Sequence, residues 1–270
     1  MLRNIKLTLE YDGTDFYGWQ VQIKSQRTVQ AEIEKALKKI FKKHVTLFGS
    51  GRTDSGVHAL GQVANFHAET KLPIATIQTA LNANLPKDIA VVGIEEVGPR
   101  FHARFSVKSK TYRYAILNRP ARCALQRRFC FFYPYPLDLR LMRAEAKALV
   151  GRHDFRSFQA ANPSRPLRDE KATTVRTVLG VEIKRKDDFI YIDIEADGFL
   201  YKMVRNIVGT LFGIGSGKLP KGSIHQILKR NDRTIAPAPA KAQGLALVEV
   251  KYVTNFLKVN SSHFKSGQSK

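Results

Sequence analysis

The chain lacks the features that mark membrane, secreted and metal-binding proteins. No stretch approaches the roughly 18 uncharged apolar residues of a membrane span, and the first residues show no apolar signal core. The only cysteines are Cys123 and Cys130, so we expect reduced thiols in a cytoplasmic protein rather than a disulfide framework. Metal-ligand spacings, a phosphate-binding loop and a dinucleotide fingerprint are all missing. We therefore expect no metal, no cofactor and no membrane association.

Acidic residues are scarce relative to basic ones. The 270 residues include 23 Asp and Glu against 45 Lys and Arg, a formal net charge of +22. Self-repulsion of this size disfavours the compact state, so a polyanionic partner is the natural explanation. Nucleic acid is favoured, because basic side chains that neutralise phosphates release counterions. Charge alone does not separate RNA from DNA, or an enzyme from a binding module.

Hydrophobic periodicity predicts the same order of elements twice. In the first half, strands at 5–11, 45–48, 62–67 and 89–97 alternate with helices that begin after Thr28 and at Pro73. In the second half, strands at 111–117, 174–183, 189–196 and 245–252 surround helices at 139–150 and 201–214, with a further helical piece at 223–228. This is the β-α-β-β-α-β order of ferredoxin-like domains.

The fold class that follows is α+β, with two ferredoxin-like domains and mainly antiparallel sheets. We place an N-terminal domain at 1–103, a C-terminal domain with Arg-rich insertions at 104–255, and a mobile basic tail at 256–270. Two such sheets side by side would leave a central basic cleft, a common place for ligands.

One glycine-rich segment holds the densest group of chemically useful side chains. Between two expected strands, three glycines bracket Arg52, Asp54 and His58. Glycines permit close approach of backbone or ligand. If Arg52 lies on the same side as Asp54, it favours an ionised and oriented carboxylate, which is a usable nucleophile. The same residues also fit an ordinary turn with a surface ion pair.

Two other interpretations of this segment stay open from the residues alone. His58 fits a general base, but more often such a histidine is a hydrogen-bonded structural residue. Asp54-Ser55-Gly56 also fits the triplet of aspartic proteases. That chemistry needs two carboxylates that share a proton, and the chain has no second triplet.

Seven motifs in order carry a resemblance to a known family. They run from near the first residue to about Val250, and they are Tyr11-Asp12-Gly13-Thr14-Asp15-Phe16-Tyr17-Gly18-Trp19-Gln20, Gly51-Arg52-Thr53-Asp54-Ser55-Gly56-Val57-His58-Ala59, Asn82-Ala83-Asn84-Leu85-Pro86, Phe101-His102-Ala103-Arg104-Phe105, Lys110-Thr111-Tyr112-Arg113-Tyr114, Gly198-Phe199-Leu200-Tyr201-Lys202-Met203-Val204-Arg205-Asn206-Ile207 and Gly244-Leu245-Ala246-Leu247. The chain resembles the tRNA pseudouridine synthase A family.

The resemblance implies a pseudouridine-synthase fold and an isomerase that turns uridine into pseudouridine without a cofactor. It implies Asp54 as the essential carboxylate and Arg205 as its ion-pair partner. It further implies that Tyr112 stacks on the target base, that Arg52 helps to expel that base from the helical stack, and that Leu245 packs beside the site. Stacking would restore part of what a flipped base loses.

The resemblance also implies the partners. The family acts on the anticodon stem-loop of tRNA, at positions 38, 39 and 40, as a homodimer. The order of the chemical steps stays open: Asp54 attacks C1′, attacks C6, or acts as a base toward a glycal. The alternative function is a non-catalytic RNA-binding module of the same fold.

Overall fold

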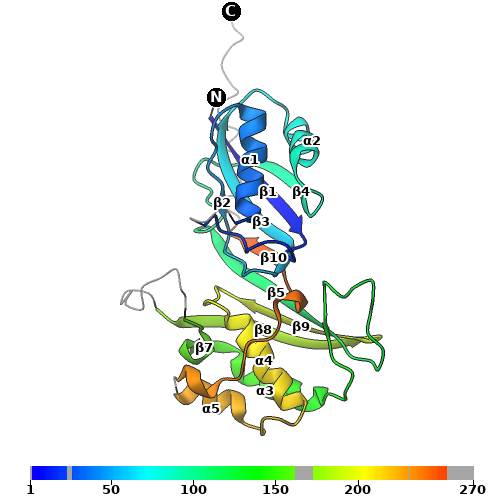
Figure 1. The fold of residues 1–270 in the computed structure, drawn as a ribbon. Coiled ribbons are helices and arrows are strands. Elements are labelled where there is room, and N and C mark those ends of the chain that lie inside the picture. The colour runs from blue at the N-terminus through cyan, green and yellow to red at the C-terminus, as the bar shows by residue number, and fades with distance from the viewer. Residues whose placement is uncertain (1, 23–25, 162–172, 231, 254–270) are drawn as a thin grey trace, which may run out of the picture.

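The computed structural model describes residues 2–22, 26–161, 173–230 and 232–253 as a mixed α+β protein (Figure 1). In its N-terminal half the elements are β1 (Leu2–Tyr11), α1 (Val29–Phe41), β2 (Phe48–Gly49), β3 (His58–Glu69), α2 (Ile74–Asn84) and β4 (Ile89–Val97). In the C-terminal half they are β5 (Val107–Leu117), β6 (Phe131–Phe132), α3 (Leu139–Ala146), β7 (Gly151–Asp154), β8 (Val175–Lys186), β9 (Phe189–Ala196), α4 (Met203–Gly215), α5 (Ser223–Arg230) and β10 (Leu245–Tyr252).

The two halves share one sheet rather than forming two separate ones. Its strand order is β4-β1-β3-β10-β5-β9-β8-β7, with β2 beside β3 and β6 beside β5. The last strand, β10, joins the halves: it pairs in parallel with β3 and antiparallel with β5. Most other pairs are antiparallel. The predicted α+β class with mainly antiparallel pairing is thus confirmed, and β10 joins the two expected sheets edge to edge into one.

Strand register places residues from both halves on one face of this sheet. Tyr11 is paired with Ala59, Ala59 with Leu247, and Leu247 with Tyr112. Paired residues in neighbouring strands point to the same side. Tyr11 and Tyr112 therefore lie on the same face, although they come from opposite halves of the chain.

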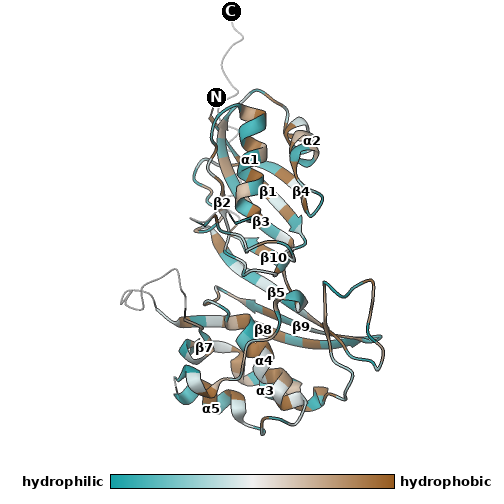
Figure 2. Ribbon diagram, viewed as in Figure 1, coloured by the Kyte–Doolittle hydropathy of each residue, from teal (hydrophilic) through white to brown (hydrophobic). Residues whose placement is uncertain are grey.

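Helices pack on the strands of each half. α1 and α2 lie with the N-terminal strands, and α3, α4 and α5 lie with the C-terminal ones (Figure 1). α1 begins at Thr28, whose hydroxyl accepts a hydrogen bond from the Ala31 amide. α4 consists mostly of hydrophobic residues (Figure 2), and most of its side chains are buried. It is thus a core helix that can hold a side chain firmly.

Several predicted boundaries differ from the structure. The strand expected at 45–48 is only Phe48–Gly49, and β3 begins at His58 instead of Gln62. The helix expected at 139–150 ends at Ala146 and continues as a 3₁₀ turn, Lys147–Leu149. The expected tail, 256–270, lies outside the described residues, and so does part of the Arg-rich segment 152–168. The boundary at 103/104 stays a prediction.

Candidate active site

The catalytic-type loop, which is the segment 50–57 that carries Asp54, lies between β2 and β3. Three hydrogen bonds hold it in place. The Ser50 amide donates to the Val63 carbonyl at 2.7 Å, and the Val57 amide donates to the Asp54 carbonyl at 3.1 Å. Lys110, on β5, donates to the Ser50 carbonyl at 2.6 Å. The loop that carries Asp54 is therefore anchored to strands from both halves.

A second loop, residues 12–20, clamps the first. The Trp19 amide donates to the Thr53 carbonyl at 3.1 Å, and the Gly56 amide donates to the Phe16 carbonyl at 3.3 Å. The hydroxyls of Tyr11 and Thr53 are 2.8 Å apart, next to Asp54 in the chain. Tyr11 is buried, and this burial raises the pKa of its phenol to about 12. The phenol is therefore a neutral hydrogen-bonding group that fixes the backbone before the carboxylate.

Two glycines make this clamp possible. A Cβ on Gly13 would lie 2.0 Å from the Val57 carbonyl oxygen, and one on Gly18 would lie 2.6 Å from the Thr53 carbonyl oxygen. Gly18 also has φ +91°, which favours glycine. Both contacts are with backbone, which cannot move aside as a flexible side chain can.

We expect Gly13→Ala to push the two loops apart. Overpacking of this kind costs roughly 1–3 kcal/mol, and the displaced loop should also lower turnover. Urea denaturation measures the stability. Gly180→Ala is the control, since Gly180 lies in β8 and a Cβ there meets nothing within 4 Å. Equal stability of the two variants would refute the clamp.

The carboxylate of Asp54 faces an arginine from the other half of the chain. Arg205 Nη1 lies 3.2 Å from Asp54 Oδ2, and both side chains are mostly buried, with exposures of 14% and 19%. A charge-assisted hydrogen bond of this kind fixes the direction of a carboxylate. The pair brings together residues that are 151 positions apart in the sequence.

Arg205 is itself held by a second contact. It lies in the first turn of α4, its Nε donates to the Ala240 carbonyl at 2.7 Å, and its own carbonyl accepts from the Ala240 amide at 2.9 Å. Gly209, one turn later, lets the chain at Ala238 approach closely. The guanidinium is thus aimed at Asp54 by the segment that leads into β10.

Tyr112 lies beside this pair and is 8% exposed. Its ring meets Phe199 edge-on, with centroids 5.2 Å apart. Burial, followed by the neighbouring Tyr11 and the negative charge of Asp54, raises the pKa of the Tyr112 phenol well above its usual range. Asp54, Arg205 and Tyr112, all predicted site residues, are therefore brought together.

The other predicted residues have different surroundings. Leu245 is buried and is paired with Tyr114, on the same face as Tyr112. Arg52 is exposed at the outer part of the loop, whereas Arg205 is mostly buried. His58 is buried and its Nδ1 accepts a hydrogen bond from the Gly13 amide at 3.0 Å, which favours the structural interpretation over a general base.

Sequence reasoning missed Tyr11 and Thr53, which support the loop of Asp54, and Phe199, which contacts the Tyr112 ring. All three lie within the quoted motifs, and the strand alternation places Tyr11 on the inner face. Nothing in the chain order, however, indicates which inner residue lies next to Asp54. That neighbourhood depends on β10, which brings β3 next to β5.

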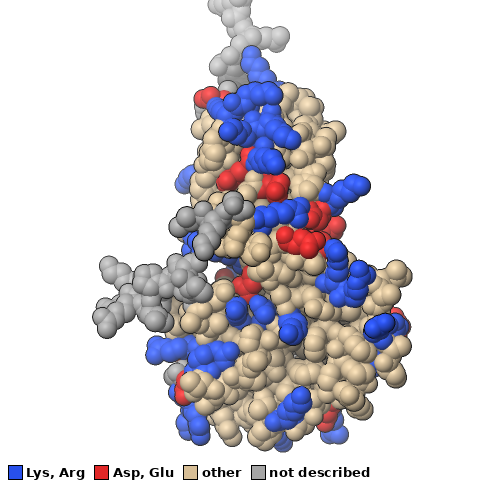
Figure 3. Space-filling model, viewed as in Figure 1, with Lys and Arg blue, Asp and Glu red and all other residues tan. Residues whose placement is uncertain are grey.

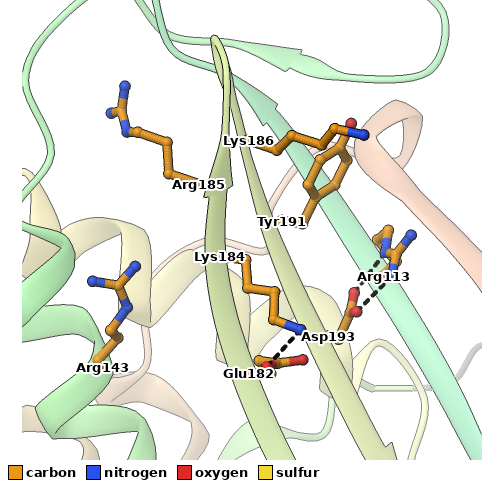
Figure 4. A pocket seen from close by; sticks show the side chains of 8 residues that line it. All are labelled: Arg113, Arg143, Glu182, Lys184, Arg185, Lys186, Tyr191 and Asp193. Carbon is orange, nitrogen blue, oxygen red and sulfur yellow. Dashed lines mark hydrogen bonds and ion pairs between the residues drawn. The ribbon is translucent and has the colours of Figure 1, made fainter.

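Two cavities lie along the sheet, and neither is lined by Asp54 or Arg205. One, of about 460 Å³, is lined by Arg113, Arg143, Glu182, Lys184, Arg185, Lys186, Tyr191 and Asp193, mostly around the β8–β9 hairpin (Figure 4). The other, of about 540 Å³, includes His58, Leu60 and Phe129 in its lining. The second cavity also includes Tyr11 and Leu245 in its lining and so reaches residues of the candidate active site, whereas the first includes none of the predicted site residues.

The described residues contain neither a candidate metal site nor a membrane-spanning helix. Within the described residues, no group of three or more His, Cys, Asp or Glu could hold a metal ion. No helix in that part of the chain is long and apolar enough to cross a membrane. Basic side chains cover α1 and are spread over both halves of the face in Figure 3.

Comparison with known proteins gives the family. A family model described as tRNA pseudouridine synthase matches residues 8–106 and 146–253. The chain belongs to the tRNA pseudouridine synthase family. Asp54, Arg52, Arg205 and Leu245 lie inside the matched ranges, and Tyr112 lies between them. As a member of this family the protein is an isomerase, and its pseudouridine-synthase fold agrees with the resemblance that the motifs predicted.

Relatives of similar length match most of the synthase. It is 47% identical over 251 residues to a tRNA pseudouridine synthase A of Thermoanaerobacter sp. (strain X514), covering 93% of this chain and 100% of the relative. It is 41% identical to one of Cronobacter sakazakii (strain ATCC BAA-894), covering 93% and 91%. A crystal structure of the archaeal box H/ACA sRNP Nop10-Cbf5 complex is similar at TM-score 0.32 and 12% identity, over 77% of this chain and 44% of that one, and supports no argument.

Proposed function

We propose that this synthase converts uridine to pseudouridine in the anticodon stem-loop of tRNA, at positions 38, 39 and 40, with Asp54 as the reacting carboxylate. The observation that supports it most is the Asp54–Arg205 ion pair beside the buried ring of Tyr112. The named relatives, which are tRNA pseudouridine synthases, support the choice of RNA. The reaction is an isomerisation with no net change of oxidation state, so it needs no redox cofactor.

The reaction breaks N1–C1′, turns the uracil and joins C5 to C1′. The hydrogen on C5 is lost as a proton to solvent, and N1 gains a proton. Asp54 starts it by attack on C1′, by attack on C6, or as a base toward a glycal, and all three routes use the carboxylate in the same place. Arg205 keeps that carboxylate directed, since its guanidinium is fixed by the Ala240 carbonyl.

The remaining residues handle the base. Tyr112 stacks on the flipped uracil, and Leu245 closes the apolar side of the site. Arg52, exposed at the outer part of the loop, contacts the RNA and helps to expel the target base. The basic surface of both halves holds the phosphates.

We expect binding to tRNA to weaken steeply with salt. Each phosphate contact contributes a slope of about −0.7 to −0.9 in log K against log salt concentration. Filter binding of unmodified tRNA at increasing KCl measures this slope. A flat response would remove tRNA phosphates as the explanation for the net charge of +22.

The assembly and location follow from the same proposal. The synthase acts as a homodimer in the cytoplasm, so that one tRNA contacts both subunits. Sedimentation of the purified protein with and without tRNA tests this. A monomer with full activity would contradict the dimer and leave the chemistry intact.

The test of the target uses tRNA with tritium at C5 of its uridines. Joining C1′ to C5 displaces that hydrogen, so tritium enters water only if pseudouridine forms. We expect release from a tRNA with uridine at positions 38–40, and none when cytidine replaces those uridines. Release from both tRNAs would support uridine isomerisation but refute positions 38–40 as the target. Tight binding without any release would favour a non-catalytic RNA-binding module.

A further inference from the structure

Three aromatic rings lie in series at the entry to the catalytic-type loop. The ring centroids of Phe48 and His102 are 4.9 Å apart, and those of His102 and Phe105 are 4.5 Å apart. We call Phe48, His102 and Phe105 the aromatic stack. Phe48 begins β2, which leads through Ser50 into the loop that carries Asp54. The stack is thus close to the reacting carboxylate along the chain, and distinct from Tyr112.

The outer ring of the stack is open to solvent. Phe105 is 76% exposed, whereas Phe48 and His102 behind it are half-buried. The Arg104 guanidinium lies 5.5 Å from the Phe105 ring centroid. An aromatic ring with a neighbouring cation suits an unpaired nucleotide. The base has a π-face that stacks on the ring, and the adjacent phosphate is negatively charged.

The loop that presents Phe105 is rigid. The Ala103 amide donates to Asn65 Oδ1 at 2.8 Å, and the Tyr252 hydroxyl donates to the Ala103 carbonyl at 2.8 Å. Around the ring itself, the His102 amide donates to the Ser106 hydroxyl at 3.2 Å, and the Ser106 amide donates back to the His102 carbonyl at 3.0 Å. An exposed ring held in this way loses little freedom on binding.

The stack is also connected to the catalytic-type loop through charge. Burial, with the nearby positive charge of Arg104, lowers the pKa of Lys110 to about 8. The same ammonium donates to the Ser50 carbonyl. Arg104 is therefore close to a group that contacts the loop of Asp54.

We infer that Phe105, backed by His102 and Phe48, stacks on an unpaired base of the RNA substrate other than the target uridine. This rests on the proposed function, in which the substrate is a tRNA stem-loop. The inner rings give Phe105 a fixed orientation, and Arg104 binds the phosphate of the stacked nucleotide. The stack therefore adds a binding position for an unpaired base beyond Tyr112.

Two substitutions separate a stacking ring from a merely apolar surface. Phe105→Leu keeps apolar volume and removes the π-face, whereas Phe105→Trp enlarges it. We expect the Leu variant to bind the tRNA roughly 5- to 100-fold more weakly, with the loss mainly in KM. The Trp variant should bind at least as well as the parent. Val92→Ala, on another exposed apolar residue in β4, should change neither binding nor turnover.

Fluorescence gives a second readout. Since Trp19 is buried, the indole that Phe105→Trp introduces is the exposed one, and a stacked base should quench its emission and shield it from acrylamide. Equal binding by the Leu, Trp and parent proteins, without quenching, would overturn the inference. So would a change of sedimentation with Phe105→Leu, which would assign the ring to contacts between protein copies. Tritium release by the parent is scored separately, so failure of the proposed function is distinguishable.

Discussion

Replacing Asp54 by Asn should abolish turnover while leaving the fold and tRNA binding largely unchanged. The amide is nearly isosteric, and its oxygen still accepts a hydrogen bond from Arg205, so the local packing is kept. It has no negative charge with which to attack C1′ or C6, or to take a proton. We expect single-turnover tritium release to fall by at least about 10³-fold, the scale on which loss of a reacting side chain acts in other enzymes.

The matched control for this variant is Ser55→Ala. Ser55 is the next residue in the loop, and its hydroxyl donates to the Phe16 carbonyl at 3.1 Å. Its loss removes one hydrogen bond of the clamp and should change turnover only a few-fold. If the Asn variant retained more than about a tenth of parental turnover, Asp54 would not be the reacting carboxylate.

Replacing Arg205 by Lys should lower kcat by roughly 10- to 100-fold with little change in KM. Lysine keeps the positive charge, but it cannot hold the Ala240 carbonyl and Asp54 at the same time, as the guanidinium does. The Asp54 carboxylate then still has a positively charged partner, but its orientation toward the substrate is no longer fixed. Rapid-quench measurement at saturating tRNA gives kcat. Arg205→Ala should lose more, and should be less stable by roughly 1–3 kcal/mol because a partly buried carboxylate loses its partner.

The control is another paired arginine outside the site. Arg113 forms two hydrogen bonds to Asp193, at 2.8 and 2.7 Å, on the opposite side of the sheet. Arg113→Lys should cost comparable stability and leave turnover unchanged. Equal loss of turnover in both variants would mean that Arg205 acts through general stability alone, which contradicts its assigned role.

The sequence predicted the helices and strands of this fold better than it predicted how the strands pair. The alternation of apolar residues and the position of Thr28 predicted β1 and α1. The order of the longer elements was predicted in both halves, but the short strands β6 and β7 were not. The single sheet was not predicted, because the pairing of β10 with both β3 and β5 depends on contacts far apart in the sequence. No local sequence pattern indicates which strands from the two halves pair with each other.

The candidate site, too, could be predicted from the residues only in part. The glycine-bracketed Asp54 stood out from residue chemistry, but its partner Arg205 is 151 positions away and was indicated by family resemblance alone. Strand alternation could not choose between Tyr112 and Tyr114, which share a face. The structure separates them: the Tyr114 hydroxyl donates to the Lys241 carbonyl, whereas Tyr112 lies within the field of Asp54.

Direct identification of the product tests the central claim most directly. Unmodified tRNA would be incubated with the purified protein and EDTA, digested to nucleosides, and separated by chromatography against a pseudouridine standard. We predict that uridine is lost and pseudouridine appears in equal amount, despite the chelator. An unchanged nucleoside profile, from tRNA that the protein demonstrably binds, would contradict the assignment of this chain as a cofactor-independent uridine isomerase.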